Sequence, residues 1–191
     1  MNVIAYVRAN LVGAWEVMLG RSQGLARLDT SIEGFWRSFG VIVLVAPFAL
    51  LSFLGEEPLV PESAPTDASA VSLPLFAVAV MVDWVSFPLI FTFVARAFGL
   101  GSHYVPFIIA RNWASVIVGA MIAVLDALHL LGIVPSTIMP FAVLGALVVA
   151  LRFSYVVART ALGVSMAVAL PVVVLDYVVS LTIWSLFRPF A

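Results

Sequence analysis

The sequence contains no cysteine and no lysine among its 191 residues. The first absence excludes disulfides, thiol nucleophiles and thiolate metal sites, and the second excludes Schiff-base chemistry and a phosphate-loop lysine. Charge is also scarce, because charged residues make up 10% of the chain, against roughly 25% in an ordinary soluble domain. The net charge is −1 and the arginines are spread along the whole chain, so we expect no nucleic-acid partner.

Apolar side chains are abundant: 64% of the residues are hydrophobic and the mean hydropathy is +1.19. A water-soluble globule of this size could not bury so much apolar surface. We therefore predict an integral membrane protein rather than a soluble enzyme. Its apolar runs are continuous and do not alternate as the strands of a membrane barrel would, so the expected fold class is all-α.

Five apolar stretches approach or exceed the roughly 20 residues that cross a hydrocarbon core about 30 Å thick. These are residues 38–54, 72–98, 106–131, 136–158 and 164–187. We predict a polytopic bundle of five transmembrane helices over residues 35–191, preceded by a cytoplasmic interfacial segment over residues 1–34.

The first segment carries an amphipathic pattern of helical spacing. One broad face is apolar, while Arg8 and Glu16 lie opposite to it, which is typical of a helix in the membrane interface. No basic region precedes these residues, so we expect no signal peptide. Thr30 followed by Glu33 forms a capping box that predicts the start of a second helix. The apolar face comprises Val3, Ile4, Val7, Leu11, Ala14, Trp15 and Met18.

The arginines predict the orientation of the bundle. All arginines but Arg188 fall before the first span or beside the loops that follow the second and fourth spans. In the loop over residues 55–71, by contrast, every charged residue is acidic. We therefore expect a multi-pass protein of a cell inner membrane, with a cytoplasmic amino terminus and a carboxyl terminus outside.

Three acidic residues, Asp83, Asp126 and Asp176, lie inside predicted spans. An intramembrane carboxylate costs at least about 2.5–3.5 kcal/mol on insertion scales, so each needs a partner or a proton. We expect no arginine at the depth of Asp83 or Asp176. Both acids are therefore expected to be protonated or to be hydrogen-bonded to hydroxyl groups such as those of Ser86, Ser180 or Tyr177. Two interpretations stay open: these acids are a proton or cation relay, or they hold helices together as neutral acids.

Four arginines, Arg96, Arg111, Arg152 and Arg159, are predicted to line the cytoplasmic loops. Guanidinium groups bind carboxylates and phosphates in a bidentate manner. These arginines could therefore hold the phosphates of anionic lipids or the acids of the amino-terminal segment, or they could only set the topology. Asp126 and His129 alone cannot complete a metal site, so no metal or other cofactor is predicted.

Small residues recur at every fourth position in the third and fourth spans. Such stripes let helices approach closely, and packing of this kind drives helix association in lipid. The link between these spans is short, so we predict a tight antiparallel hairpin, with self-association through one stripe as the alternative. The stripes are Ser115, Gly119, Ala123 and Ala127 in the third span, and Ala142, Ala146, Ala150 and Ser154 in the fourth.

Two stretches, residues 93–102 and residues 152–165, carry a resemblance to a known family. The first closes a span in a glycine-serine turn, and the second is an aromatic, basic and small-residue stretch that leads into the last span. In these features the chain resembles the Yip1-type family of small five-span membrane proteins, over roughly residues 35 to 187. The resemblance implies a membrane-organising or interaction protein, and it transfers no catalytic residue.

We therefore expect a non-enzymatic membrane protein that organises lipids or a membrane protein complex through its arginine-lined face. One alternative is a small proton- or cation-coupled carrier that uses the intramembrane aspartates. Another is an accessory subunit of a larger respiratory or photosynthetic complex, since the chain has little water-soluble mass.

Overall fold

The computed structural model describes residues 2–55 and 73–187, and within these ranges the chain is helical and forms no strand. The predicted all-α class is therefore confirmed. The predicted acidic loop lies outside the described residues apart from Gly55, and so does Arg188. The elements are α1 (Val3–Met18), η1 (Ser22–Arg27), α2 (Ile32–Phe39), α3 (Ile42–Gly55), α4 (Leu73–Ala97), α5 (Gly101–Leu130), α6 (Met139–Leu162) and α7 (Met166–Phe187).

Five helical segments among these residues are long and apolar enough to cross a membrane, as the hydropathy predicted. The first consists of α2 and α3, which follow one another with a short break at Gly40–Val41. The others are α4, α5, α6 and α7. The chain is therefore a multi-pass, all-α membrane protein.

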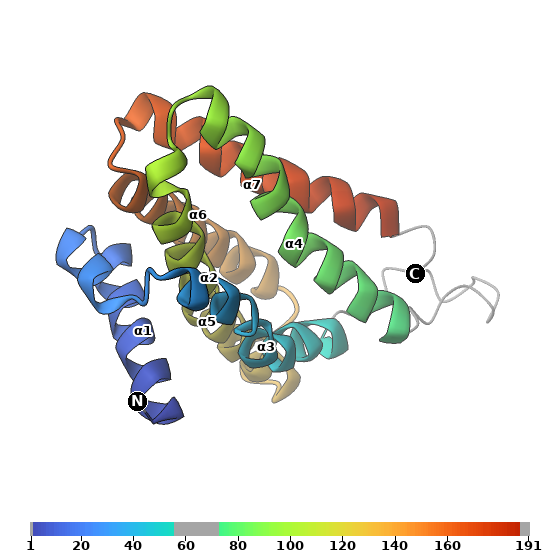
Figure 1. Cartoon of the computed structure of the whole chain (residues 1–191). Coiled ribbons are helices and arrows are strands. Elements are labelled where there is room, and N and C mark those ends of the chain that lie inside the picture. The colour runs from blue at the N-terminus through green and yellow to red at the C-terminus, as the bar shows by residue number, and fades with distance from the viewer. Residues whose placement is uncertain (1, 56–72, 188–191) are drawn as a thin grey trace.

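Helix α5 lies at the centre of the arrangement (Figure 1). It packs against α1, α2, α3, α4 and α6, while α7 closes the other side by contacting α4 and α6. The predicted hairpin is present, because α5 and α6 are joined by a short link and pack against each other. Helices α4, α5, α6 and α7 consequently form a ring in which each contacts its neighbours.

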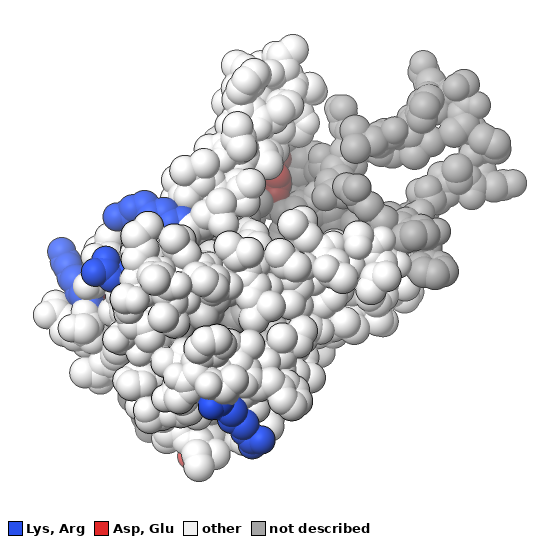
Figure 2. Space-filling view, turned by 90° about the horizontal axis from the view of Figure 1, so that it is seen from above, with Lys and Arg blue, Asp and Glu red and all other residues white. Residues whose placement is uncertain are grey.

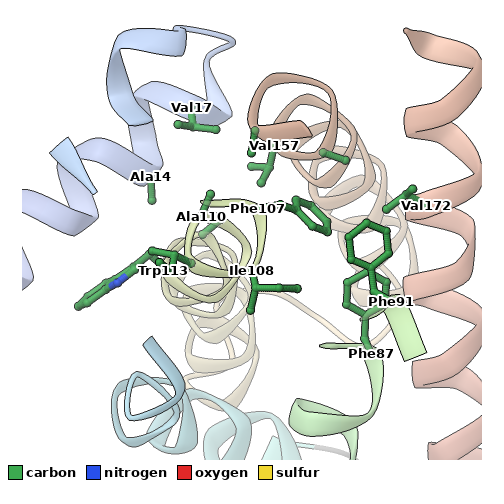
Figure 3. Packing of buried hydrophobic residues seen from close by; sticks show 14 of the residues in the cluster. Ala14, Val17, Phe87, Phe91, Phe107, Ile108, Ala110, Trp113, Val157 and Val172 are labelled. Atoms are coloured by element: carbon green, nitrogen blue, oxygen red, sulfur yellow. The ribbon is translucent and has the colours of Figure 1, made fainter. Parts of the chain in front are cut away.

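Aromatic and aliphatic side chains from these helices fill the core (Figure 3). Phe87 and Phe91 of α4 are stacked with ring centroids 5.4 Å apart, and Phe107 of α5 meets Phe91 edge-on at 5.0 Å. Trp113 of α5 points the other way, toward α1, where its ring meets that of Tyr6. The core thus continues from the ring of four helices to the amino-terminal helix.

Helix α1 packs on the bundle, against α5 and α6. Of its predicted apolar face, Ala14 and Met18 are fully buried together with Val17, whereas Val3 and Ile4 are about three-quarters exposed (74% and 75%). Partly buried Tyr6, Val7 and Leu11 also pack against the core, so the first turn of α1 is the part whose apolar side chains stay largely outside the tertiary packing.

The start of α2 differs from the capping-box prediction. Ser31, not Thr30, is the N-cap, and its Oγ accepts a hydrogen bond from the Gly34 amide at 2.9 Å. Asp29 accounts for the shift, since its Oδ1 accepts hydrogen bonds from the amide and hydroxyl of Ser31. The serine is thereby held in the capping position.

Candidate functional site

A cavity of about 350 Å³ lies within the ring of α4, α5, α6 and α7. Its walls are largely apolar, with Phe107, Val118 and Val173 among them. Seven polar or charged side chains also line it, and this combination of apolar walls with a few polar groups is typical of ligand sites. They are Asp83, Arg111, Ser115, Ser154, Asp176, Tyr177 and Ser180.

Arg111 and Asp176 form a bidentate ion pair in this cavity. The Nε of Arg111 donates to Oδ2 of Asp176 at 2.9 Å, and Nη2 donates to Oδ1 at 2.7 Å. Both side chains are only 18% exposed. A charge-assisted fork of this kind is among the stronger polar contacts in proteins, and it joins α5 to α7.

This pair corrects the prediction that no arginine shares the depth of Asp176, and it removes Arg111 from the predicted loop arginines. Helix α5 begins at Gly101, five residues before the apolar run that starts at Pro106. Arg111 therefore lies ten residues inside the helix, about 15 Å along its axis at 1.5 Å per residue. It lines the cavity and is not placed to bind lipid phosphates at a loop.

Two further groups hold the Arg111 guanidinium in place. Its carbon lies 4.7 Å from the centre of the Phe87 ring, a cation–π contact that covers one face of the group. The second group is Asn112, whose Oδ1 accepts from Nη1 of Arg111 at 3.5 Å. The Asn112 amide in turn donates to Ser38 Oγ at 3.1 Å, and Asn112 and Ser38 are fully buried. The Arg111 turn of α5 is thereby anchored to α4 through Phe87 and to α2 through Ser38.

Asp83 of α4 is the second acid of the cavity and is half-buried. Ser180 and Trp184 of α7 lie beside its carboxyl group, and Arg111 and Asp176 lie within electrostatic range. None of the ion pairs formed by the described residues includes Asp83. The predicted hydroxyl partner Ser180 is thus a neighbour, whereas Ser86 donates to Val82 O of its own helix.

Asp126 is not part of this site. It is buried elsewhere on α5, and Ser52 Oγ of α3 donates to its carboxylate. His129 points its Nδ1 at the carbonyl oxygen of Val134 at 2.8 Å. The three intramembrane acids therefore have three different environments, and only Asp83 and Asp176 share a cavity.

The other predicted loop arginines, Arg96, Arg152 and Arg159, are exposed. Arg96 and Arg159 lie in the last turns of α4 and α6, as expected for helix ends. Arg152 lies ten residues before the end of α6, with its guanidinium over the Phe153 ring at 5.6 Å. The face of the molecule drawn in Figure 2 is mostly uncharged, with arginine side chains toward its left and lower edges and few acidic atoms visible.

The acids of the amino-terminal segment bind other arginines than predicted. Glu16 pairs with Arg27 at 2.9 Å, and Glu33 pairs with Arg37 one turn further along α2. Both pairs are local. Glu33 reaches Arg37 one helical turn away, and Glu16 reaches Arg27 in the adjoining η1, so neither pair requires a distant loop to become ordered. The segment docks on the bundle through apolar contacts of α1 with α5 and α6. Asn10 joins two parts of the segment itself, because its Oδ1 accepts from the Asp29 amide.

The two small-residue stripes have different surroundings. On α5, Ser115 and Gly119 line the cavity, and a Cβ added at Gly119 would lie 3.3 Å from the Phe48 ring of α3. Ala123 is buried and Ala127 is partly buried. On α6, Ala150 is buried, Ala142 and Ala146 are partly buried, and Ser154 lines the cavity. The α5 stripe therefore leaves room for the Phe48 ring, and both stripes contribute residues to the cavity wall.

No known protein family, curated protein or solved structure matches this chain. The resemblance to the Yip1-type family stays a prediction. The feature of the molecule that bears on function is the cavity, in which one arginine and two aspartates meet hydroxyl groups inside an apolar helix bundle.

Proposed function

We propose that this protein is a small membrane carrier that moves a proton or another cation through the cavity, with Asp83 as the exchanging group. The observation that carries the proposal is the position of Asp83 on the cavity wall beside an Arg111–Asp176 pair that already neutralises its own charges. Ionisable residues inside an apolar bundle are costly, and they commonly mark ion pathways.

The three intramembrane acids support different roles. Asp176 is held by Arg111 and Asp126 by Ser52, so each has a partner that explains its position structurally. Asp83 has Ser180 beside it, faces open volume, and has no arginine bonded to it among the described residues. It is therefore the acid best suited to gain and lose a cation during transport.

The test is cation flux into proteoliposomes that contain the purified protein. A potassium gradient with valinomycin imposes a negative internal potential, and an internal dye reports proton entry. We expect wild-type protein to accelerate entry and Asp83→Asn to abolish the acceleration. Asp126→Asn is the matched control, because it makes the same change in the same bundle outside the cavity, and it should retain the flux.

The proposal fails if Asp83→Asn transports at the wild-type rate. It also fails if folded wild-type protein moves no proton, sodium or organic ammonium ion under an imposed potential. Asp176→Asn is a poor probe, because losing the partner of Arg111 is expected to destabilise the fold itself.

A second function, the organisation of anionic lipid, is favoured by the exposure of Arg96 and Arg159 in the last turns of α4 and α6. In this proposal both helix ends face the cytoplasm and bind lipid phosphates. Arg96→Gln combined with Arg159→Gln should then lower the amount of phosphatidylglycerol that copurifies. Arg8→Gln serves as the control for an exposed arginine on another helix, and equal lipid content in both variants would contradict the idea.

A further inference from the structure

The cavity contains more negative than positive charge. Its ionisable carboxyl and guanidinium groups are two aspartates, Asp83 and Asp176, and one arginine, Arg111. Arg111 and Asp176 are matched by a bidentate pair. When all three groups are ionised, the uncompensated charge is therefore that of Asp83.

We infer that the ligand of this cavity is a small organic ammonium ion, whose charged head binds Asp83 and whose apolar body contacts the walls. This inference rests on the proposed function and names the class of cation. The head would meet the Asp83 carboxylate and the Ser180 hydroxyl, both on the cavity wall. The carboxylate and the hydroxyl can each accept a hydrogen bond, and an ammonium group can only donate.

The shape and chemistry of the walls favour an ion with an apolar body. Apart from its charged groups and four hydroxyl groups, the lining is apolar and includes the aromatic and aliphatic side chains Phe107, Ile122, Val157 and Val172. The volume, about 350 Å³, lies at the lower end of the roughly 300–1,000 Å³ typical of ligand pockets. A bare alkali ion would leave most of this volume and its apolar surface without a partner.

An anionic ligand is disfavoured by the same geometry. To reach Arg111 it would have to displace Asp176 from two hydrogen bonds of 2.9 and 2.7 Å. It would also approach the carboxylate of Asp83, which repels it in a medium of low dielectric constant. Phe87 covers one face of the Arg111 guanidinium, so an anion has fewer directions from which to reach it.

The test compares three probes of similar size on the full-length protein in detergent: hexylammonium, hexanol and hexanoate. Tryptophan fluorescence reports occupancy, because Trp184 lies beside Asp83. We expect saturable quenching by hexylammonium, at least about tenfold tighter than any response to hexanol or hexanoate. The comparison needs no variant, so it stays decisive even where a substitution impairs folding.

Asp83→Asn should weaken hexylammonium binding about tenfold, while Asp126→Asn binds like wild-type protein. Equal binding of the three probes, tighter binding of hexanoate, or full displacement of hexylammonium by low millimolar sodium would each overturn the inference. The proposed function is judged separately by cation flux, of protons, sodium and hexylammonium. Flux of protons or sodium that depends on Asp83, without ammonium binding, removes only the inference. Ammonium binding without any flux removes only the carrier.

Discussion

Arg111 of α5 binds both carboxylate oxygens of Asp176 of α7, a residue 65 positions later in the chain. The pair is the polar link between the central helix and the last helix, which otherwise contacts the bundle through α4 and α6. Its two partners differ in one chemical respect. A carboxylate can take up a proton and become neutral, whereas a guanidinium stays charged under all ordinary conditions.

This difference predicts unequal effects of two substitutions that break the same ion pair. Asp176→Asn leaves a buried guanidinium without its counter-ion, and we expect it to lower the free energy of unfolding by about 3–5 kcal/mol. Arg111→Gln should cost less, since Asp176 can then be protonated. Denaturation in detergent, followed by tryptophan fluorescence, measures both.

The double variant, Arg111→Gln with Asp176→Asn, removes both charges and should be more stable than Asp176→Asn alone. Equal losses in the two single variants, or a double variant that loses the sum of both, would contradict this account of the pair.

The hydrogen bond from Ser52 to Asp126 gives a second prediction. Polar contacts between membrane helices are worth about 0.6 kcal/mol on average and up to about 1.7, so Ser52→Ala should cost about 1 kcal/mol. Asp126→Asn keeps an acceptor oxygen and should cost less than Asp126→Ala. Ser86→Ala is the control, since Ser86 bonds only within its own helix. In a double-mutant cycle, the losses of unfolding free energy caused by Ser52→Ala and Asp126→Ala should not add up. Additive losses would show that the two groups do not interact in the folded protein.

Much of the fold follows from hydropathy, because a membrane span is defined by the length of its apolar run. The boundaries were less predictable, as α5 shows. The apolar run begins at Pro106, but the helix includes the five preceding residues, among them the polar Ser102 and His103. That extension places Arg111 inside the bundle. An arginine within an apolar helix and an aspartate in another were visible signals of an intramembrane pair.

The candidate site was predicted only in its parts. Asp83 and Asp176 were identified as intramembrane acids, but their common cavity depends on how α4 and α7 pack, which no local pattern encodes. Their spacing places Ser115 and Ser154 in packing stripes, yet both line the cavity. The burial of Ala14 and Val17 in α1 is likewise a tertiary effect, since an amphipathic helix can bury its apolar face in lipid or against protein.

A third prediction concerns the contact between α1 and η1. A Cβ added at Gly24 would lie 2.5 Å from the carbonyl oxygen of Gly13 and 2.9 Å from the amide nitrogen of Val17. Both atoms are backbone and cannot move aside without shifting α1. We expect Gly24→Ala to cost about 1–3 kcal/mol, as overpacking does, and to speed trypsin cleavage at the exposed Arg21 and Arg27.

The matched control is Gly145→Ala, because a Cβ at this position on α6 meets nothing within 4 Å. This variant should unfold and be cleaved like wild-type protein. Unchanged cleavage in Gly24→Ala would mean that the two segments do not pack as closely in the membrane as they do in the structure.

The last prediction is a pH dependence that originates at Tyr6 of α1. Its hydroxyl is buried without a hydrogen-bond partner among the described residues. Burial is the main cause that raises the pKa of Tyr6 above its ordinary value near 10; the nearby Asp29 and Glu33 also raise it, and Arg37 lowers it without reversing the direction. The folded state therefore holds this proton more tightly than the unfolded state does. The resulting contribution to stability is fully present below pH 10 and is lost as the pH rises through the folded-state pKa.

We expect Tyr6→Phe to match or exceed wild-type stability at pH 8, since it removes an unpartnered hydroxyl, and to lose less stability between pH 8 and pH 11. Thermal unfolding at the two pH values measures this loss, and an equal loss in both proteins would show that Tyr6 ionises as freely when folded as when unfolded.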